Sequence, residues 1–222
     1  MRSREASLRA YLKYVFFPVV GTLGAVAAWS KTTNVPASDL MRDAVAVLDG
    51  PFYVGALSTL SVSLWVVGAV ASFVAYLVLK ERLADHPGVS FFRWSALFSL
   101  VLAADDAFLL HEVVGPDYLS VSSLAFYGGY GVFLAILLGT QYRFILDGHY
   151  LILAVGLLFF GLSLAIDIAY DVFSLSFYAG GFWEDGCKLI GLSAWASYFV
   201  FEAVRCLSRP VWTDAPELVP RA

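Results

Sequence analysis

The chain has 222 residues, of which 60% are hydrophobic and 14% charged, and its mean hydropathy is +0.76. A soluble domain is closer to about 45–50% apolar and about 25% charged. The formal net charge is −4 and no basic stripe is present, which excludes the electrostatic footprint of a nucleic-acid-binding protein. The composition therefore predicts an integral membrane protein with membrane lipid around it.

Six apolar stretches approach or exceed the ~20 residues needed to cross a bilayer. They are approximately residues 10–29, 52–79, 92–114, 122–141, 151–171 and 183–206. We therefore expect an all-α fold, in which residues 1–209 form a single compact bundle of six transmembrane helices. The proline-containing residues 210–222 are predicted to be a disordered cytoplasmic tail. The basic start of the first stretch also fits a cleaved secretory signal, which would leave five spans.

Lysines and arginines divide unequally between the two sides that six spans define. Most of them flank span ends on the side of the N-terminus, whereas Lys31 and Arg42 fall on the other side. The positive-inside rule then predicts that both termini are cytoplasmic and that the chain is a multi-pass protein of the cell membrane.

Three connecting or packing features can be predicted from local sequence. Residues 38–49 begin with Ser38 and carry apolar residues on one face, which indicates a short interfacial helix capped by Ser38. The pair Gly115-Pro116 is typical of a helix stop after the third stretch. Small residues let membrane helices approach closely, so four glycines predict that the fourth stretch packs near the centre of the bundle. These are Gly128, Gly129, Gly131 and Gly139.

Ionisable residues inside membrane spans are costly and suggest a functional site. Seven acids lie in or at the ends of the third, fifth and sixth stretches, together with one histidine and one lysine. They are Asp105, Asp106, Glu112, Asp167, Asp171, Glu184 and Asp185, with His111 and Lys188. Because the spans alternate in direction, all nine fall within about 10 Å of the extracytoplasmic surface. The sequence therefore predicts one acidic site that faces that side.

Helical spacing places some of these residues on common faces. Asp105 and Glu112 are about 20° apart around a helix and share a face. Glu184 and Lys188 are four residues apart, which predicts an ion pair within one helix.

The charge balance of the acidic site predicts a bound cation or shared protons. Seven carboxyl groups cannot all be ionised beside one lysine in a low-dielectric site. Oxygen ligands suit Mg²⁺, Mn²⁺ or Ca²⁺, and a histidine would also admit iron or zinc. We therefore expect a divalent metal ion of unknown identity, held by Asp105, Asp106, Glu112 and Asp167. Catalytic roles are predicted for Asp106, His111 and Lys188, with Asp171, Glu184 and Asp185 in support.

Three functions fit this pattern. The first is a metal-dependent membrane-embedded hydrolase or transferase, in which metal-bound water attacks a lipid-like substrate and Lys188 neutralises the developing charge. The second is a cation- or proton-coupled carrier or channel, for which the inner half offers Glu202, Tyr198, Tyr142 and Gln141. The third is a structural or partner-binding protein whose polar network holds the helices together. The motifs of membrane desaturases and of CAAX-protease-like proteins are absent, and the sequence motifs assign no family.

Overall fold

The computed structural model describes residues 12–42, 44–51, 53–171 and 180–208. Over those ranges the chain is all-helical and contains no strand, as the sequence predicts. The chain divides into two compact units, Met1–Ala56 and Leu57–Ala222, and each is described by itself. The predicted disordered tail, residues 210–222, lies outside the described residues.

The first unit contains one longer helix and three short helical segments. They are η1 (Leu12–Phe16), α2 (Phe17–Thr33), α3 (Ala37–Met41) and α4 (Ala44–Val47). The first predicted span, residues 10–29, corresponds to η1 and α2. However, α2 has only 17 residues, because residues 12–16 form the separate π-helical segment η1 before it. The prediction of six full-length spans is therefore only roughly matched.

The predicted interfacial helix over residues 38–49 is divided into α3 and α4. Extended backbone at Arg42 (φ −95°, ψ 158°) ends the first of these helices. The prediction of Ser38 as N-cap is wrong, since Pro36 holds that position and the Ser38 hydroxyl donates to Asp39 Oδ1 at 3.1 Å.

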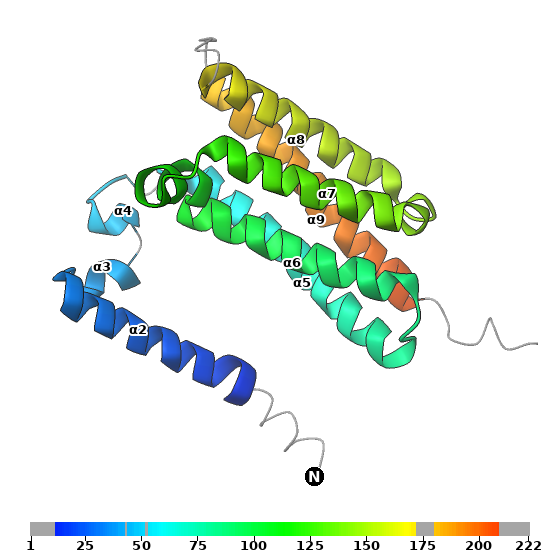
Figure 1. Ribbon diagram of the computed structural model, residues 1–222, viewed down its shortest axis with the longest axis horizontal. Helices are drawn as coiled ribbons and strands as arrows, with labels where there is room; N and C mark the ends of the chain where they lie inside the picture. Colours follow the sequence, from blue (N-terminus) through cyan, green and yellow to red (C-terminus); the bar gives the residue numbers. More distant parts are fainter. Residues whose placement is uncertain (1–11, 43, 52, 172–179, 209–222) are drawn as a thin grey trace, which may run out of the picture. The chain divides into compact units, whose positions relative to one another are not determined.

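The second unit is built from five long helices. They are α5 (Ala56–Arg82), α6 (Pro87–Phe108), α7 (Ser123–Leu146), α8 (Tyr150–Asp171) and α9 (Gly180–Ser208). Each contains a segment long and apolar enough to cross a membrane, which fits a multi-pass membrane protein. Successive helices alternate in direction, so α6 and α8 end where α7 and α9 begin (Figure 1). We call the end of the bundle where α6 and α8 finish the cavity end. The end that carries the α7–α8 turn is called the opposite end.

Aromatic side chains from α5, α6 and α9 fill the core of the second unit. The rings of Phe91 and Phe199 lie 5.8 Å apart, and those of Trp65 and Trp195 lie 5.7 Å apart. Such pairs contribute beyond the apolar area that they bury.

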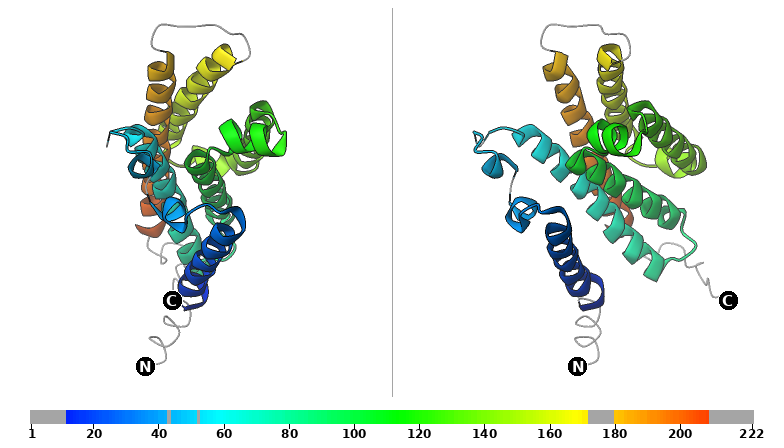
Figure 2. Two further views of the ribbon diagram at one scale, coloured as in Figure 1. Left: turned by 90° about the vertical axis from the view of Figure 1, so that its left-hand side faces the viewer. Right: turned by 60° about the vertical axis from the view of Figure 1, so that its left-hand side comes forward.

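Helices α8 and α9 pack along each other (Figure 2). A Cβ on Gly191 of α9 would lie 3.2 Å from the Gly156 carbonyl oxygen and 2.9 Å from the Phe160 ring. The close approach of the two helices therefore requires a residue without a side chain at this position.

Helix α7 does not lie near the centre of the bundle, contrary to the sequence prediction. Only 6% of its apolar window is buried, compared with 44% in α6 and α9. A Cβ added to any of its four glycines would meet nothing within 4 Å. The glycines thus border open space instead of a neighbouring helix, and Gly131 borders the cavity described below.

The third predicted span, residues 92–114, ends earlier than expected. Helix α6 stops because Leu109 adopts a left-handed conformation (φ 51°, ψ 43°) and donates its N–H to the Asp105 carbonyl. A π-helical segment, η2 (Leu110–Leu119), follows and continues through Pro116. The prediction that Gly115-Pro116 stops the helix is therefore wrong. His111 and Glu112 lie on η2, beyond the membrane-spanning helix.

Candidate functional site

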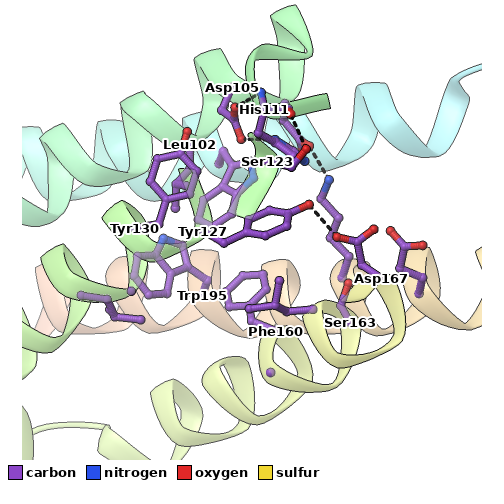
Figure 3. A pocket seen from close by; sticks show the side chains of 18 of the residues that line it. Leu102, Asp105, His111, Ser123, Tyr127, Tyr130, Phe160, Ser163, Asp167 and Trp195 are labelled. Carbon is purple, nitrogen blue, oxygen red and sulfur yellow. Dashed lines mark hydrogen bonds and ion pairs between the residues drawn. The ribbon is translucent and has the colours of Figure 1, made fainter. Parts of the chain in front are cut away.

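A cavity of about 790 Å³ opens within the second unit and is lined by residues of α5 to α9 and η2. Its volume lies within the range of roughly 300–1,000 Å³ typical of small-molecule sites. Asp105 and His111 lie on one side, whereas Phe160 and Trp195 lie on the other, with the Tyr127 ring between them (Figure 3). The cavity is therefore amphiphilic, with separate polar and aromatic walls.

Asp105 at the end of α6 holds His111 through two contacts. Its Oδ1 accepts the His111 backbone N–H at 2.9 Å, and its Oδ2 lies 2.6 Å from His111 Nδ1. The left-handed turn at Leu109 brings His111 back over the end of the helix that carries Asp105. Both residues are buried, with 5% and 8% of their surfaces exposed. In the neutral tautomer that donates from Nδ1 to Asp105, His111 Nε2 is a proton acceptor.

The surroundings of His111 shift its pKa. Burial lowers the pKa, but the hydrogen bond to Asp105 and the negative charges of Asp105 and Glu112 outweigh it, so the pKa lies above the usual 6.5. Glu112 Oε1 lies 3.6 Å from His111 Nε2. A histidine whose pKa is moved toward or above neutrality is suited to proton transfer at physiological pH.

The next residue of α6, Asp106, forms an ion pair with Lys188 of α9 through its Oδ1. The predicted ion pair of Lys188 within its own helix is therefore replaced by one between helices. The Asp106 side chain is only 9% exposed, and its Oδ2 is buried with no hydrogen-bond partner among the described residues. Glu184 also lines the cavity, one turn before the lysine.

Two tyrosines of α7 belong to the cavity and were not singled out from the sequence. The Tyr127 hydroxyl donates to Asp167 Oδ2 of α8 at 2.6 Å, and its ring lies 5.1 Å from the His111 ring. Tyr130, one turn further along α7, also lines the cavity. One sequence feature could have identified them. They lie three residues apart in the glycine-rich start of α7, which faces the acidic stretches.

The structure brings eight of the nine acidic-site residues to this one cavity. They are Asp105, Asp106, His111, Glu112, Asp167, Glu184, Asp185 and Lys188. The side chain of the ninth, Asp171, lies outside the described part of the structure. The catalytic, metal-binding and supporting roles given to these residues stay predictions.

Three of the four predicted metal ligands are already hydrogen-bonded to another side chain. Asp105 contacts a histidine, Asp106 a lysine and Asp167 a tyrosine. Within residues 12–42, 44–51, 53–171 and 180–208, no three His, Cys, Asp or Glu side chains are grouped as metal ligands would be. A divalent ion therefore stays a prediction that needs a direct measurement.

The aromatic wall of the cavity is rigidly built. Trp65 and Phe160 stack with their ring centroids 5.3 Å apart, and the Trp195 ring lies 6.0 Å from Phe160. The Trp195 indole N–H donates to the Ser99 hydroxyl at 3.0 Å, so its polar atom is satisfied inside the core. Trp65 and Trp195 are 6% and 1% exposed, so the part of this wall that is open to a ligand is mainly Phe160.

A second polar cluster lies at the opposite end and surrounds Glu202 of α9. The fully buried Glu202 carboxylate accepts from the backbone N–H of His149 at 2.6 Å and from Arg205 Nε at 2.7 Å. Arg205 also binds Asp147 in the α7–α8 turn at 3.1 Å. Between this cluster and Lys188, α9 contributes the fully buried rings of Trp195 and Phe199. Glu202 therefore attaches the α7–α8 turn to α9.

The fold and the cavity together define an all-helical, multi-pass membrane protein with a polar site at one end of its bundle. The chain belongs to the family described as "Domain of unknown function (DUF8692)", whose model matches residues 14–201. No curated protein and no solved structure matches the chain.

Proposed function

We propose that the protein is a membrane-embedded hydrolase or transferase that acts on a lipid-like, amphiphilic substrate. The observation that carries this proposal is the Asp105–His111 pair, which lines a cavity whose other wall is aromatic. A carboxylate that orients one ring nitrogen of a histidine leaves the other nitrogen free for acid–base chemistry. An apolar chain of the substrate would lie along the aromatic wall, with its reactive group near His111.

In the proposed reaction, His111 Nε2 takes a proton from a water molecule or an alcohol. The resulting oxygen nucleophile attacks the carbonyl carbon of an ester or amide. The C–O or C–N bond to the leaving group then breaks as the departing oxygen or nitrogen takes the proton from His111. Lys188 is the cationic group of the cavity and would stabilise the negative oxygen that develops. Asp105 keeps the imidazole oriented throughout.

We also propose that the cavity end faces the extracytoplasmic side of the cell membrane. The basic residues near the helix ends of the second unit support this orientation, because they lie at the opposite end of the bundle. They are Lys80 and Arg82 of α5, Arg143 of α7 and Arg205 of α9. Positive charge of this kind is typical of cytoplasmic ends.

A cation carrier is less well supported than an enzyme. The polar groups at the two ends of α9, Lys188 and Glu202, are separated by turns that bear the buried rings of Trp195 and Phe199, with Tyr198 as a buried polar side chain between them. Carriers instead need polar groups along a pathway.

The test is turnover by the full chain in lipid nanodiscs. A panel of long-chain esters and amides is incubated with the wild type and with His111→Gln, and products are quantified by mass spectrometry. We expect at least one class to be cleaved by the wild type and to be cleaved about 10²–10⁴-fold more slowly by the variant. A parallel series with a chelator reports whether a divalent ion takes part. Equal rates for the two proteins would contradict the proposal.

A further inference from the structure

The cavity contains more acidic side chains than basic ones. Six carboxyl groups line it, against one lysine and one histidine. They are Asp105, Asp106, Glu112, Asp167, Glu184 and Asp185. Carboxylates held together in a low-dielectric site favour a cationic ligand and disfavour an anionic one.

One of these carboxylates has an unfilled hydrogen-bonding position. Asp106 Oδ1 is bound by Lys188, whereas Asp106 Oδ2 is buried and has no partner among the described residues. Its side chain is 9% exposed and borders the cavity. An ionised carboxylate only accepts hydrogen bonds, and a buried acceptor without a donor is costly. A ligand whose donor reaches this oxygen would remove that cost.

The opposite wall restricts the ligand further. Phe160 borders the cavity, with the buried rings of Trp65 and Trp195 packed against it, and a hydrated metal ion would not use this apolar surface. An aliphatic chain instead buries apolar area there.

From these features we infer that the cavity binds an amphiphile whose polar head is an ammonium group with N–H donors, such as a long-chain primary amine. The head donates to Asp106 Oδ2 within the ring of carboxylates, and the chain lies against the aromatic wall. A quaternary ammonium has the charge but no donor, and an alcohol has a donor but no charge. Neither compound therefore provides both the positive charge that the carboxylates favour and the hydrogen-bond donor that Asp106 Oδ2 lacks. The inference rests on the proposed function in taking this cavity for the substrate site, and it specifies the class of substrate.

Binding of three amphiphiles with the same chain length tests the inference. Dodecylamine, dodecyltrimethylammonium and dodecanol are titrated into the full chain in zwitterionic nanodiscs, with empty nanodiscs correcting for partition into lipid. Tryptophan emission is the readout, because Trp65 and Trp195 belong to the cavity wall. We expect dodecylamine to bind at least about tenfold more tightly than the other two. Equal binding of dodecyltrimethylammonium or dodecanol would overturn the inference.

Substitutions of single carboxylates test whether these groups bind the amine. Asp106→Asn is expected to weaken dodecylamine binding about tenfold or more and to leave dodecanol binding unchanged. Because this change also leaves Lys188 without its partner, Glu184→Gln provides a second variant that keeps the ion pair, and it should weaken dodecylamine binding in the same direction. Glu81→Gln, at the other end of α5, is the charge-matched control and should have no effect. Unchanged dodecylamine affinity in folded Asp106→Asn, or in Glu184→Gln, would overturn the inference.

The proposed enzymatic function and the inferred amine ligand can each be refuted without refuting the other. Selective amine binding without cleavage of any ester or amide would refute the proposed enzyme and leave the inference standing. Cleavage of neutral amphiphiles that depends on His111, without amine selectivity, would leave the enzyme standing and refute the inference.

Discussion

At the scale of residues, the two neighbouring aspartates of α6 have different partners. Asp105 orients His111 from the following segment, and Asp106 reaches Lys188 on a distant helix. Their residue types and depth could be predicted from the sequence, because acids in apolar stretches are conspicuous. The partners could not be predicted. The contact of Asp105 with His111 depends on a left-handed turn at Leu109, a residue type that seldom adopts this conformation. The contact of Asp106 with Lys188 depends on how α6 and α9 are placed in the bundle.

The raised pKa of His111 gives the proposed reaction a defined pH dependence. A general base acts in its neutral form, so the rate should rise with pH through a value above 6.5. Asp105→Asn removes the charge that raises this pKa, so the acidic limb of the pH–rate profile should move to lower pH. The rate should also fall, because an amide cannot hold the same imidazole tautomer.

The profile is measured between about pH 5 and pH 9. Asp117→Asn, an exposed position of η2 outside the cavity, is the matched control and should keep the wild-type profile. An acidic limb at the same pH in Asp105→Asn and the wild type would argue against His111 as the base.

At the scale of elements, long apolar stretches predicted α5 to α9 well, because a bilayer-length helix is a strong pattern. Features decided by packing were missed. The glycines of α7 suggested a central helix, but they border open space. Conversely, the attachment of the α7–α8 turn to α9 through Glu202 could not be expected from any sequence pattern.

That attachment predicts a glycine requirement in the turn. A Cβ on Gly148 would lie 2.2 Å from Glu202 Oε1, and the fully buried Glu202 has little room to move. Gly148→Ala should therefore destabilise the protein by about 1–3 kcal/mol. Gly139→Ala in α7, where a Cβ meets nothing within 4 Å, should be neutral or stabilising by up to about 1 kcal/mol. Thermal unfolding in detergent compares the two, and equal melting temperatures would contradict the close contact.

At the scale of the whole molecule, alternating helix directions gather residues that are about eighty positions apart in sequence into one cavity. This could be predicted from topology, because three stretches place their acids at the same depth. The shape of the cavity and its aromatic wall could not, since they depend on which faces of α5, α8 and α9 turn toward each other.

The proposed orientation predicts which segments an external reagent reaches. In a background with Cys187→Ser and Cys206→Ser, single cysteines replace Tyr118 in η2 or Asp85 between α5 and α6, both of which are exposed. A membrane-impermeant maleimide added to intact cells should label Tyr118→Cys, whereas Asp85→Cys should react only after permeabilisation. The reverse pattern would place the cavity on the cytoplasmic side.

Whether His111 performs chemistry in the cavity is tested by comparing two histidine variants on the best substrate of the panel. Turnover rates are measured for the wild type, His111→Gln and His149→Gln in the same nanodiscs. His149 is the matched control, because it also contacts a buried carboxylate, that of Glu202, but at the opposite end. We predict a loss of about 10²–10⁴-fold for His111→Gln and a rate within about twofold of the wild type for His149→Gln. Equal losses in the two variants, or no loss in His111→Gln, would contradict the account.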